Sequence, residues 1–146
     1  MIAIDTNILV YAHRGDSPFH ELASSCVRGL AQGRAPWCLL WQCIHEFLGV
    51  VTHPRIYDPP SPIEVALAQV DAWLESPSVV LLTEPDDYWE ILRRQVQAGV
   101  VTGPRIHDAR IASLCLSHGI AELWSADRDF SRFGDLVVRN PWAGAR

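Results

Sequence analysis

The chain has 146 residues, enough for one substantial hydrophobic core, and we expect residues 1–146 to form a single domain. Hydrophobic residues make up 49% of the chain and charged residues 20%, a balance that argues against disorder. No apolar run approaches the roughly 18 residues that a membrane-spanning helix needs. No basic leader precedes the first apolar residues, so we expect a cytoplasmic protein with no membrane partner.

The basic residues are all arginine, and the net charge is −5. A negative balance is unfavourable for a protein that binds nucleic acid, because phosphate groups attract cations. It is compatible with such binding where several carboxylates hold divalent metal ions, since bound ions invert the local charge. The four cysteines form no CxxC pair and lie in apolar stretches, which favours buried, reduced thiols over zinc or disulfides.

Short apolar strands alternate with helices along the chain. Compact apolar runs predict the strands, and apolar residues at helical spacing predict the helices. In chain order we expect a strand at 2–4, a helical turn at 6–11, a helix at 20–31, a strand at 37–41, helices at 42–52 and 63–74, a strand at 79–82, helices at 86–98 and 106–118, and strands at 122–124 and 136–138. This alternation predicts an α/β domain with a mainly parallel sheet and helices on both faces.

Acidic residues fall where two predicted strands end. Asp5 closes the first strand, and Asp127 lies just after the strand at 122–124. Two further acids lie on helices: Glu46 follows the second strand, and Asp108 begins the helix before the fourth. Because ligands of open α/β sheets gather at the carboxyl ends of the strands, these four acids are candidates for one site.

The two helical acids share their helix faces with apolar residues. Glu46 is in line with Cys43 and Val50, and Asp108 is in line with Ile111, so we expect both acids to face inwards. A carboxylate on a buried face destabilises the fold unless it is paired or bound to a metal.

Each acid also has a structural interpretation. Asp5 and Asp108 are placed to cap helices, and Glu46 fits a partly exposed acid of an amphipathic helix. Asp127 and Asp129 fit ordinary turn acids. Gathered at one sheet edge, however, the four carboxylates would repel one another unless cations neutralised them. Hard divalent ions such as Mg²⁺ or Mn²⁺ prefer oxygen ligands, and such a site suits hydrolysis of a phosphodiester.

Four motifs, in this order, resemble the PIN-domain family and, within it, the VapC-type toxins of bacterial toxin–antitoxin pairs. They are Ile4-Asp5-Thr6-Asn7, Glu46 after the second strand, His107-Asp108-Ala109, and Trp124-Ser125-Ala126-Asp127-Arg128-Asp129-Phe130. Their order and spacing cover nearly the whole chain. The resemblance implies a PIN-like α/β fold with a central five-stranded sheet flanked by helices. It also implies Mg²⁺- or Mn²⁺-dependent endoribonuclease activity.

The resemblance implies roles for individual residues as well. The carboxylates that would hold the metal and carry catalysis are Asp5, Glu46, Asp108 and Asp127. Asp129 is the alternative fourth ligand and otherwise an auxiliary acid, and Thr6 and Ser125 match polar positions that orient the site. The implied partners are an RNA substrate, a small VapB-type antitoxin and a second copy of the chain in a homodimer.

Two other sets of residues invite a role with RNA. Arg105, Arg110 and Arg128 lie near the proposed acids and are candidates for phosphate contacts, the alternative being exposure or pairing with acids. Six tryptophans suggest base stacking. Most of them fall in apolar patterns, so we expect core positions for Trp37, Trp41, Trp73 and Trp124.

Other functions fit the residues less well or stay open. A phosphatase of the haloacid-dehalogenase type needs a second Asp two residues after the first, where this chain has Asn7, and a receiver domain needs a lysine. A PIN-type nuclease of RNA processing, a nuclease acting on DNA and a non-catalytic binding module stay open. Binding of divalent metal separates the last of these from the nucleases.

Overall fold

Five parallel strands form one sheet in the computed structural model of the protein, which describes residues 1–144. Their order across the sheet is β3-β2-β1-β4-β5, and every neighbouring pair is parallel. The strands are β1 (Ile2–Ile4), β2 (Trp37–Leu40), β3 (Val79–Leu82), β4 (Glu122–Trp124) and β5 (Val138–Arg139). The predicted α/β fold with a five-stranded, mainly parallel sheet is therefore confirmed.

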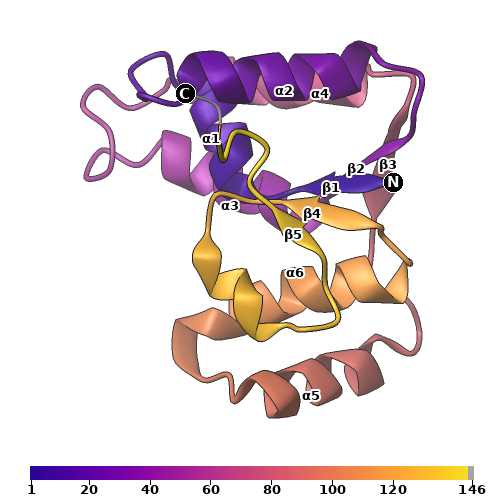
Figure 1. Ribbon diagram of the computed structural model, residues 1–146. Coiled ribbons are helices and arrows are strands. Elements are labelled where there is room, and N and C mark those ends of the chain that lie inside the picture. Colours follow the sequence, from indigo (N-terminus) through magenta and orange to yellow (C-terminus); the bar gives the residue numbers. More distant parts are fainter. Residues whose placement is uncertain (145–146) are drawn as a thin grey trace.

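Helices cover both faces of the sheet, as the crossover rule predicts (Figure 1). Helices α2 and α4 lie on one side of the sheet, and α5 and α6 lie on the other. The helices are α1 (Thr6–His13), α2 (His20–Gln32), α3 (Trp41–Val51), α4 (Ile63–Leu74), α5 (Tyr88–Gly99) and α6 (Ile106–Ser117). Within residues 1–144, none of them has the length and apolar character needed to cross a membrane.

The end of the chain differs from the prediction. Two short 3₁₀ helices, η1 (Gly103–Arg105) and η2 (Arg128–Arg132), were not predicted. The last strand begins at Val138 instead of residue 136, because Leu136 serves a turn. Its side chain is buried, and its backbone N–H donates to the carbonyl of Phe133 at 3.0 Å.

The middle of the sheet forms the centre of the core. All four residues of β2 and the last two of β1 are fully buried, as expected for strands covered on both faces. In α3, Phe47 packs edge-on against Trp73 of α4 with ring centroids 4.8 Å apart. Cys38, Cys43 and Cys115 are buried free thiols, as predicted, whereas the fourth free thiol, Cys26, is only half-buried.

The register between β1 and β4 places two polar residues side by side. Ile4 pairs with Trp124, so the residues that follow, Asp5 and Ser125, leave the sheet next to each other. The Asp5 backbone N–H donates to the Trp124 carbonyl at 2.9 Å, which extends the pairing by one step. Because β1 is the central strand, the functional candidates begin at the middle of the carboxyl edge of the sheet.

Candidate active site

The carboxylate of Asp5 is the centre of a hydrogen-bond network. Asp5 is only 5% exposed and caps α1, because its Oδ1 accepts the backbone N–H of Thr6 at 2.7 Å. Its Oδ2 accepts the Ser125 hydroxyl at 2.6 Å and the Asn7 side-chain amide at 3.0 Å. Asp5 is thus a helix cap, as one interpretation held, and its carboxylate also lines the candidate site.

Asn7 and Ser125 continue the network to the segment after β4. The Asn7 amide also donates to the Ser125 hydroxyl oxygen at 3.2 Å, and its own oxygen accepts the backbone N–H of Ala126 at 3.2 Å. The Ser125 oxygen accepts the backbone N–H of Asp127 at 3.0 Å. These bonds hold the segment around Asp127 next to Asp5, so that hydrogen bonds join the ends of β1 and β4.

Glu46 is positioned by Thr6. The Thr6 hydroxyl donates to Glu46 Oε2 at 2.7 Å, which connects α1 to α3. The expectation that Glu46 faces inwards on a buried stripe is wrong: Glu46 and Gly49 are exposed, and Val50 is only half-buried. The physical reason is that this part of α3 borders an open cleft, so its apolar neighbours do not indicate burial.

Asp108 is the third residue of α6 and is half-buried. Its neighbours Ile111 and Cys115 are buried, so the inward-facing stripe predicted for α6 is correct. Asp108 makes no side-chain capping bond to its helix, contrary to the capping interpretation. The start of α6 is instead held by Gln42 of α3, a buried side chain whose amide donates to the carbonyl of His107 at 3.1 Å.

The four predicted acids line one cleft. Its volume is about 310 Å³, and it is lined by Asp5, Thr6, Asn7, Val10, Tyr11, Glu46, Val50, Tyr57, Asp108, Ile111 and Asp127. Segments far apart in the chain meet here: the ends of β1 and β4, the middle and last turn of α3 and the first turn of α6. Asp127 also lines a neighbouring cleft of about 550 Å³ that includes Ser125 and Arg128.

The charges in this cleft repel one another. Burial raises the pKa of Asp5 to about 6; the hydrogen bonds from Ser125 and Thr6 oppose this rise, and the charges of Glu46 and Asp108 add to it. The pKa of Asp108 is also raised, first by burial and then by neighbouring carboxylates, with Asp127 the largest of these. Such a cleft favours cations.

The donor set of the cleft fits a hard divalent ion. Carboxylate and hydroxyl oxygens line it, with no cysteine or histidine among the lining residues, and Mg²⁺ and Mn²⁺ prefer oxygen ligands. Within residues 1–144, no three His, Cys, Asp or Glu side chains already stand close enough together to hold an ion. The acids therefore share one cleft without forming a closed coordination shell.

The remaining predicted residues lie around this cleft. Asp129 is exposed; its carboxylate pairs with Arg105 at 2.6 Å, and its backbone N–H donates to Asp127 Oδ1 at 2.8 Å. Arg110 pairs with Glu84, before α5, and not with the proposed acids. Arg128 is exposed beside the neighbouring cleft. Arg105 and Arg110 thus follow the alternative of pairing with acids.

Sequence reasoning missed several residues of the site. Asn7 entered it only as an argument against a phosphatase, although its position two residues after a strand-ending acid is a signal that the side chain could reach the site. Gln42, Tyr11 and Tyr57 gave no signal. One predicted core residue is wrong, since Trp41 is 38% exposed.

The family model of the PIN domain matches residues 2–136, so the chain belongs to the PIN-domain family. Ribonuclease VapC48 of Mycobacterium tuberculosis is 34% identical to it over 140 residues, which cover 96% of this chain and 97% of the relative. Two solved structures share the fold. VapBC2 of Rickettsia felis, bound to a promoter DNA fragment, has a TM-score of 0.65 at 21% identity and covers 95% and 98% of the two chains. VapC20 of Mycobacterium tuberculosis, a toxin that cleaves the sarcin–ricin loop, has a TM-score of 0.67 at 17% identity and covers 90% and 93%.

We expect the metal-free protein to lose stability as the pH rises through the titration of Asp5. Its pKa of about 6 in the folded protein lies above the ordinary value of 3.8, so the folded state holds this proton more tightly than the unfolded state. The contribution of Asp5 is therefore most favourable below about pH 4, declines up to about pH 6, and is then lower by about 3 kcal/mol. Urea unfolding of EDTA-treated protein at pH 5 and pH 8 measures the part of this change that lies above pH 5, about 1.4 kcal/mol.

Asp108→Asn provides the matched variant, because the Asp108 side chain accepts no hydrogen bond within the described residues while Asp5 accepts three. Removing the charge of Asp108 should leave the free energy of unfolding at pH 8 equal or higher. A clear loss of stability in this variant would contradict the repulsion.

Proposed function

We propose that this chain is a Mg²⁺- or Mn²⁺-dependent endoribonuclease and the toxin of a VapBC-type toxin–antitoxin pair. The observation that carries the proposal is the gathering of Asp5, Glu46, Asp108 and Asp127 around one cleft at the carboxyl edge of the sheet. Relatives at 30–34% identity over more than nine-tenths of this chain are named as ribonucleases of the VapC type, which supports RNA as the substrate. Residues 1–146 would act as one domain.

In this proposal the four acids hold the metal. When bound, a divalent ion lowers the pKa of a coordinated water and offsets the negative charge that builds on the phosphate. Thr6 holds Glu46, and Ser125 and Asn7 hold Asp5, so the ligands lose little freedom when an ion binds.

Arg128 is the arginine best placed to contact the RNA backbone. It is exposed beside Asp127, in the neighbouring cleft, where a phosphate next to the scissile one would lie. Arg105 and Arg110 can serve only by leaving their partners Asp129 and Glu84.

The first test is RNA cleavage with and without metal. Wild-type protein should cut a panel of RNAs with Mg²⁺ or Mn²⁺ and lose this activity in EDTA. Asp108→Asn should reduce kcat by more than about 100-fold while the protein stays folded, because a metal ligand is lost. Glu64→Gln, which removes an exposed acid of α4, is the control and should behave as wild type.

Three outcomes would count against the proposal. Cleavage that persists in EDTA would contradict the metal, and cleavage of matched DNA but not RNA would move the assignment to a DNA nuclease. Absence of both cleavage and divalent-metal binding by calorimetry would favour a binding module.

The second test separates the two late acids. Asp127 lines the cleft and Asp129 pairs with Arg105, so we expect Asp127 to be the fourth ligand and Asp129 to be auxiliary. Asp127→Asn keeps an oxygen that can cap η2 and should lower kcat by more than about 100-fold, whereas Asp129→Asn should lower it less than about tenfold. Single-turnover cleavage measures both, and the reverse ranking would assign the fourth position to Asp129.

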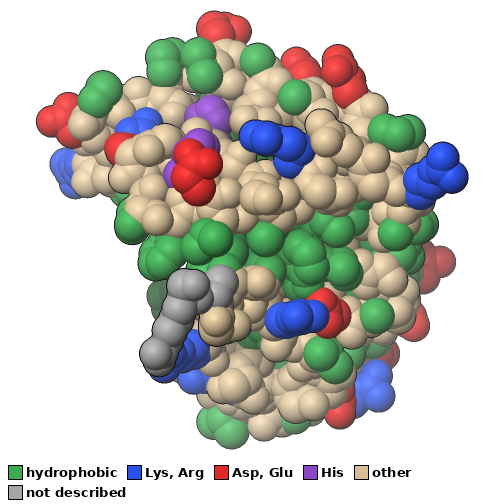
Figure 2. Space-filling model, turned by 45° about the horizontal axis from the view of Figure 1, so that its top comes forward, with side chains coloured by type: hydrophobic (Ala, Val, Ile, Leu, Met, Phe, Trp, Pro, Cys, Tyr) green, Lys and Arg blue, Asp and Glu red, His purple; other side chains and the backbone are tan. Residues whose placement is uncertain are grey.

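An apolar surface supports the antitoxin as a partner. Figure 2 shows a band of hydrophobic side chains across one face of the molecule. Phe19, directly before α2, and Leu22 in its first turn are each 40% exposed. A partner helix with an apolar face could cover such residues and place an arginine or lysine among the acids of the cleft, where it would exclude metal and RNA together.

We therefore expect the product of an adjacent short reading frame to bind this chain and inhibit it. Co-expression, co-purification and the cleavage assay test this, and light scattering on the free chain tests the homodimer, which stays a prediction. Inhibition should weaken in high salt but persist in part, since only the charge contact is screened. A complex with undiminished cleavage would contradict the toxin while leaving the nuclease unaffected.

A further inference from the structure

Two tyrosines line the cleft that holds the acids. Tyr11 comes from α1, and Tyr57 comes from the loop between α3 and α4. Both are half-buried. Val10 and Val50 are further neutral residues of the lining, and we call these four residues the aromatic wall, in a cleft that four carboxylates also line.

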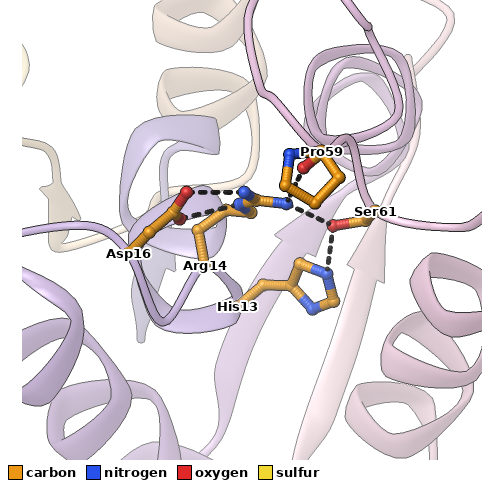
Figure 3. Close-up of polar contacts among 5 residues, drawn as sticks. All are labelled: His13, Arg14, Asp16, Pro59 and Ser61. Carbon is orange, nitrogen blue, oxygen red and sulfur yellow. Dashed lines mark hydrogen bonds and ion pairs between the residues drawn. The ribbon is translucent and has the colours of Figure 1, made fainter.

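Tyr57 is held in place by Arg14. The guanidinium of Arg14 lies over the Tyr57 ring, 4.2 Å from its centroid, and covers one face of it. Arg14 is itself fixed by Asp16, to which it donates through Nε at 2.8 Å and Nη2 at 2.6 Å (Figure 3). Its Nη1 donates to the Pro59 carbonyl at 3.1 Å and to the Ser61 hydroxyl at 3.2 Å.

This network joins the end of α1 to the loop that carries Tyr57. Figure 3 shows Arg14 between Asp16 on one side and Pro59 and Ser61 on the other, with His13 on the same serine. The His13 Nε2 lies 3.0 Å from the Ser61 hydroxyl. Every nitrogen of Arg14 is engaged, so its charge is not available to a phosphate, and its effect on a ligand must pass through Tyr57.

Tyr11 is held by other aromatic rings. Its ring centroid lies 5.3 Å from that of Phe19 and 6.3 Å from that of Trp142, and these two rings stack on each other at 5.9 Å. Within residues 1–144, the pKa of the Tyr57 phenol is influenced by burial and nearby charges and by no hydrogen bond, and the hydrogen bond found at Tyr11 is accepted by its backbone carbonyl and not made by its phenol. Two fixed rings with free phenol groups therefore face a ligand-sized space.

We infer that the aromatic wall is a nucleobase subsite, in which Tyr57 stacks on a base next to the scissile phosphate and Arg14 positions Tyr57. This inference rests on the proposed function. A neutral ring suits a base, whereas the neighbouring carboxylates repel phosphate unless metal is bound. Unpaired RNA is recognised in this way, by stacking of splayed bases on aromatic side chains and hydrogen bonds to their edges.

The central experiment measures RNA binding in a cleavage-deficient background. In Asp108→Asn protein with Mg²⁺, Tyr57→Ala should weaken binding of a labelled single-stranded RNA about tenfold, because one stacking contact is lost. Tyr57→Trp should retain the affinity, and Tyr57→Phe should fall between the two. The matched control is Trp89→Ala, which removes a ring of α5 that is 63% exposed and lies outside the cleft, and it should leave the affinity unchanged.

A double-mutant cycle tests the base directly. Cleavage of an RNA pool by the wild-type protein first maps the cut site. Binding is then measured for RNAs that each lack the base at one nucleotide flanking the cut. At one of these nucleotides, removal of the base should weaken binding by wild-type Tyr57 about tenfold but have little further effect in Tyr57→Ala. The subsite would be overturned if the effects of base removal and of Tyr57→Ala on affinity multiplied at every nucleotide. It would also be overturned if Tyr57→Ala left the affinity unchanged.

Arg14→Lys tests the positioning role. Lysine keeps the charge but cannot hold Asp16, Pro59 and Ser61 together. It should raise KM with kcat unchanged, and it should have no further effect on KM in Tyr57→Ala. An equal effect in both backgrounds would assign Arg14 a separate role.

The outcomes distinguish this inference from the proposed nuclease. RNA cleavage that is normal in Tyr57→Ala, with unchanged affinity, would remove the subsite and leave the nuclease. RNA binding that depends on Tyr57 in a protein that never cleaves RNA would support the subsite and contradict the nuclease. If Tyr57→Ala left RNA affinity unchanged but abolished binding of the adjacent reading frame's product, the aromatic wall would be a protein-docking surface and the inference would be wrong.

Discussion

Hydrogen bonds around the carboxylate of Asp5 hold together the ends of β1 and β4, the start of α1 and Glu46 of α3. Asp5 ends the central strand, so any displacement of its side chain is opposed by β1, α1 and the segment after β4 at once. Thr6, the next residue, donates a hydrogen bond to Glu46. Asn7, which follows it, accepts one from the backbone N–H of Ala126, directly before Asp127. Three consecutive residues thus orient acids that come from distant parts of the chain.

The same arrangement opposes folding. An ionised Asp5 is buried among other carboxylates, and its raised pKa corresponds to about 3 kcal/mol of unfavourable interaction, a sizeable part of the roughly 5–15 kcal/mol by which a domain is stable. The fully buried strands β1 and β2 and the Phe47–Trp73 contact offset this strain. Any cation that binds only the folded cleft adds its binding free energy to stability, so the affinity for metal and the stability of the fold are coupled.

The positions of Asp5, Asp108 and Asp127 could be predicted because they follow from topology. Parallel strands present their carboxyl ends at one edge, where the acids that follow β1 and β4 lie, and the helix that leads into β4 begins at that same edge with Asp108 in its first turn. The exposure of Glu46 could not be predicted in this way, since its neighbour Val50 lines the cleft and Gly49 is exposed, so this face of the helix is not buried in the core.

Loop residues lay beyond such patterns. Tyr57 belongs to a non-periodic, proline-rich loop, and its place at the cleft depends on Arg14, 43 positions earlier in the chain. The pairing of Arg110 with Glu84 is likewise a tertiary contact between segments that no local spacing connects. Composition drew attention to tryptophan, for which apolar patterns favoured core positions, and gave no signal for the two tyrosine rings that line the cleft.

The distribution of arginine charge limits how the proposed RNA substrate would be held. The chain has no lysine, and Arg14, Arg105 and Arg110 are each paired with an acid near the site. Arg128 is exposed beside the neighbouring cleft, but a single cation in a protein of net charge −5 gains little from counterion release. In the proposed function, most of the affinity would then come from metal on the carboxylates and from contacts that do not depend on charge. Stacking on a ring such as Tyr57 is a contact of that kind, and it tolerates salt where a phosphate contact would not.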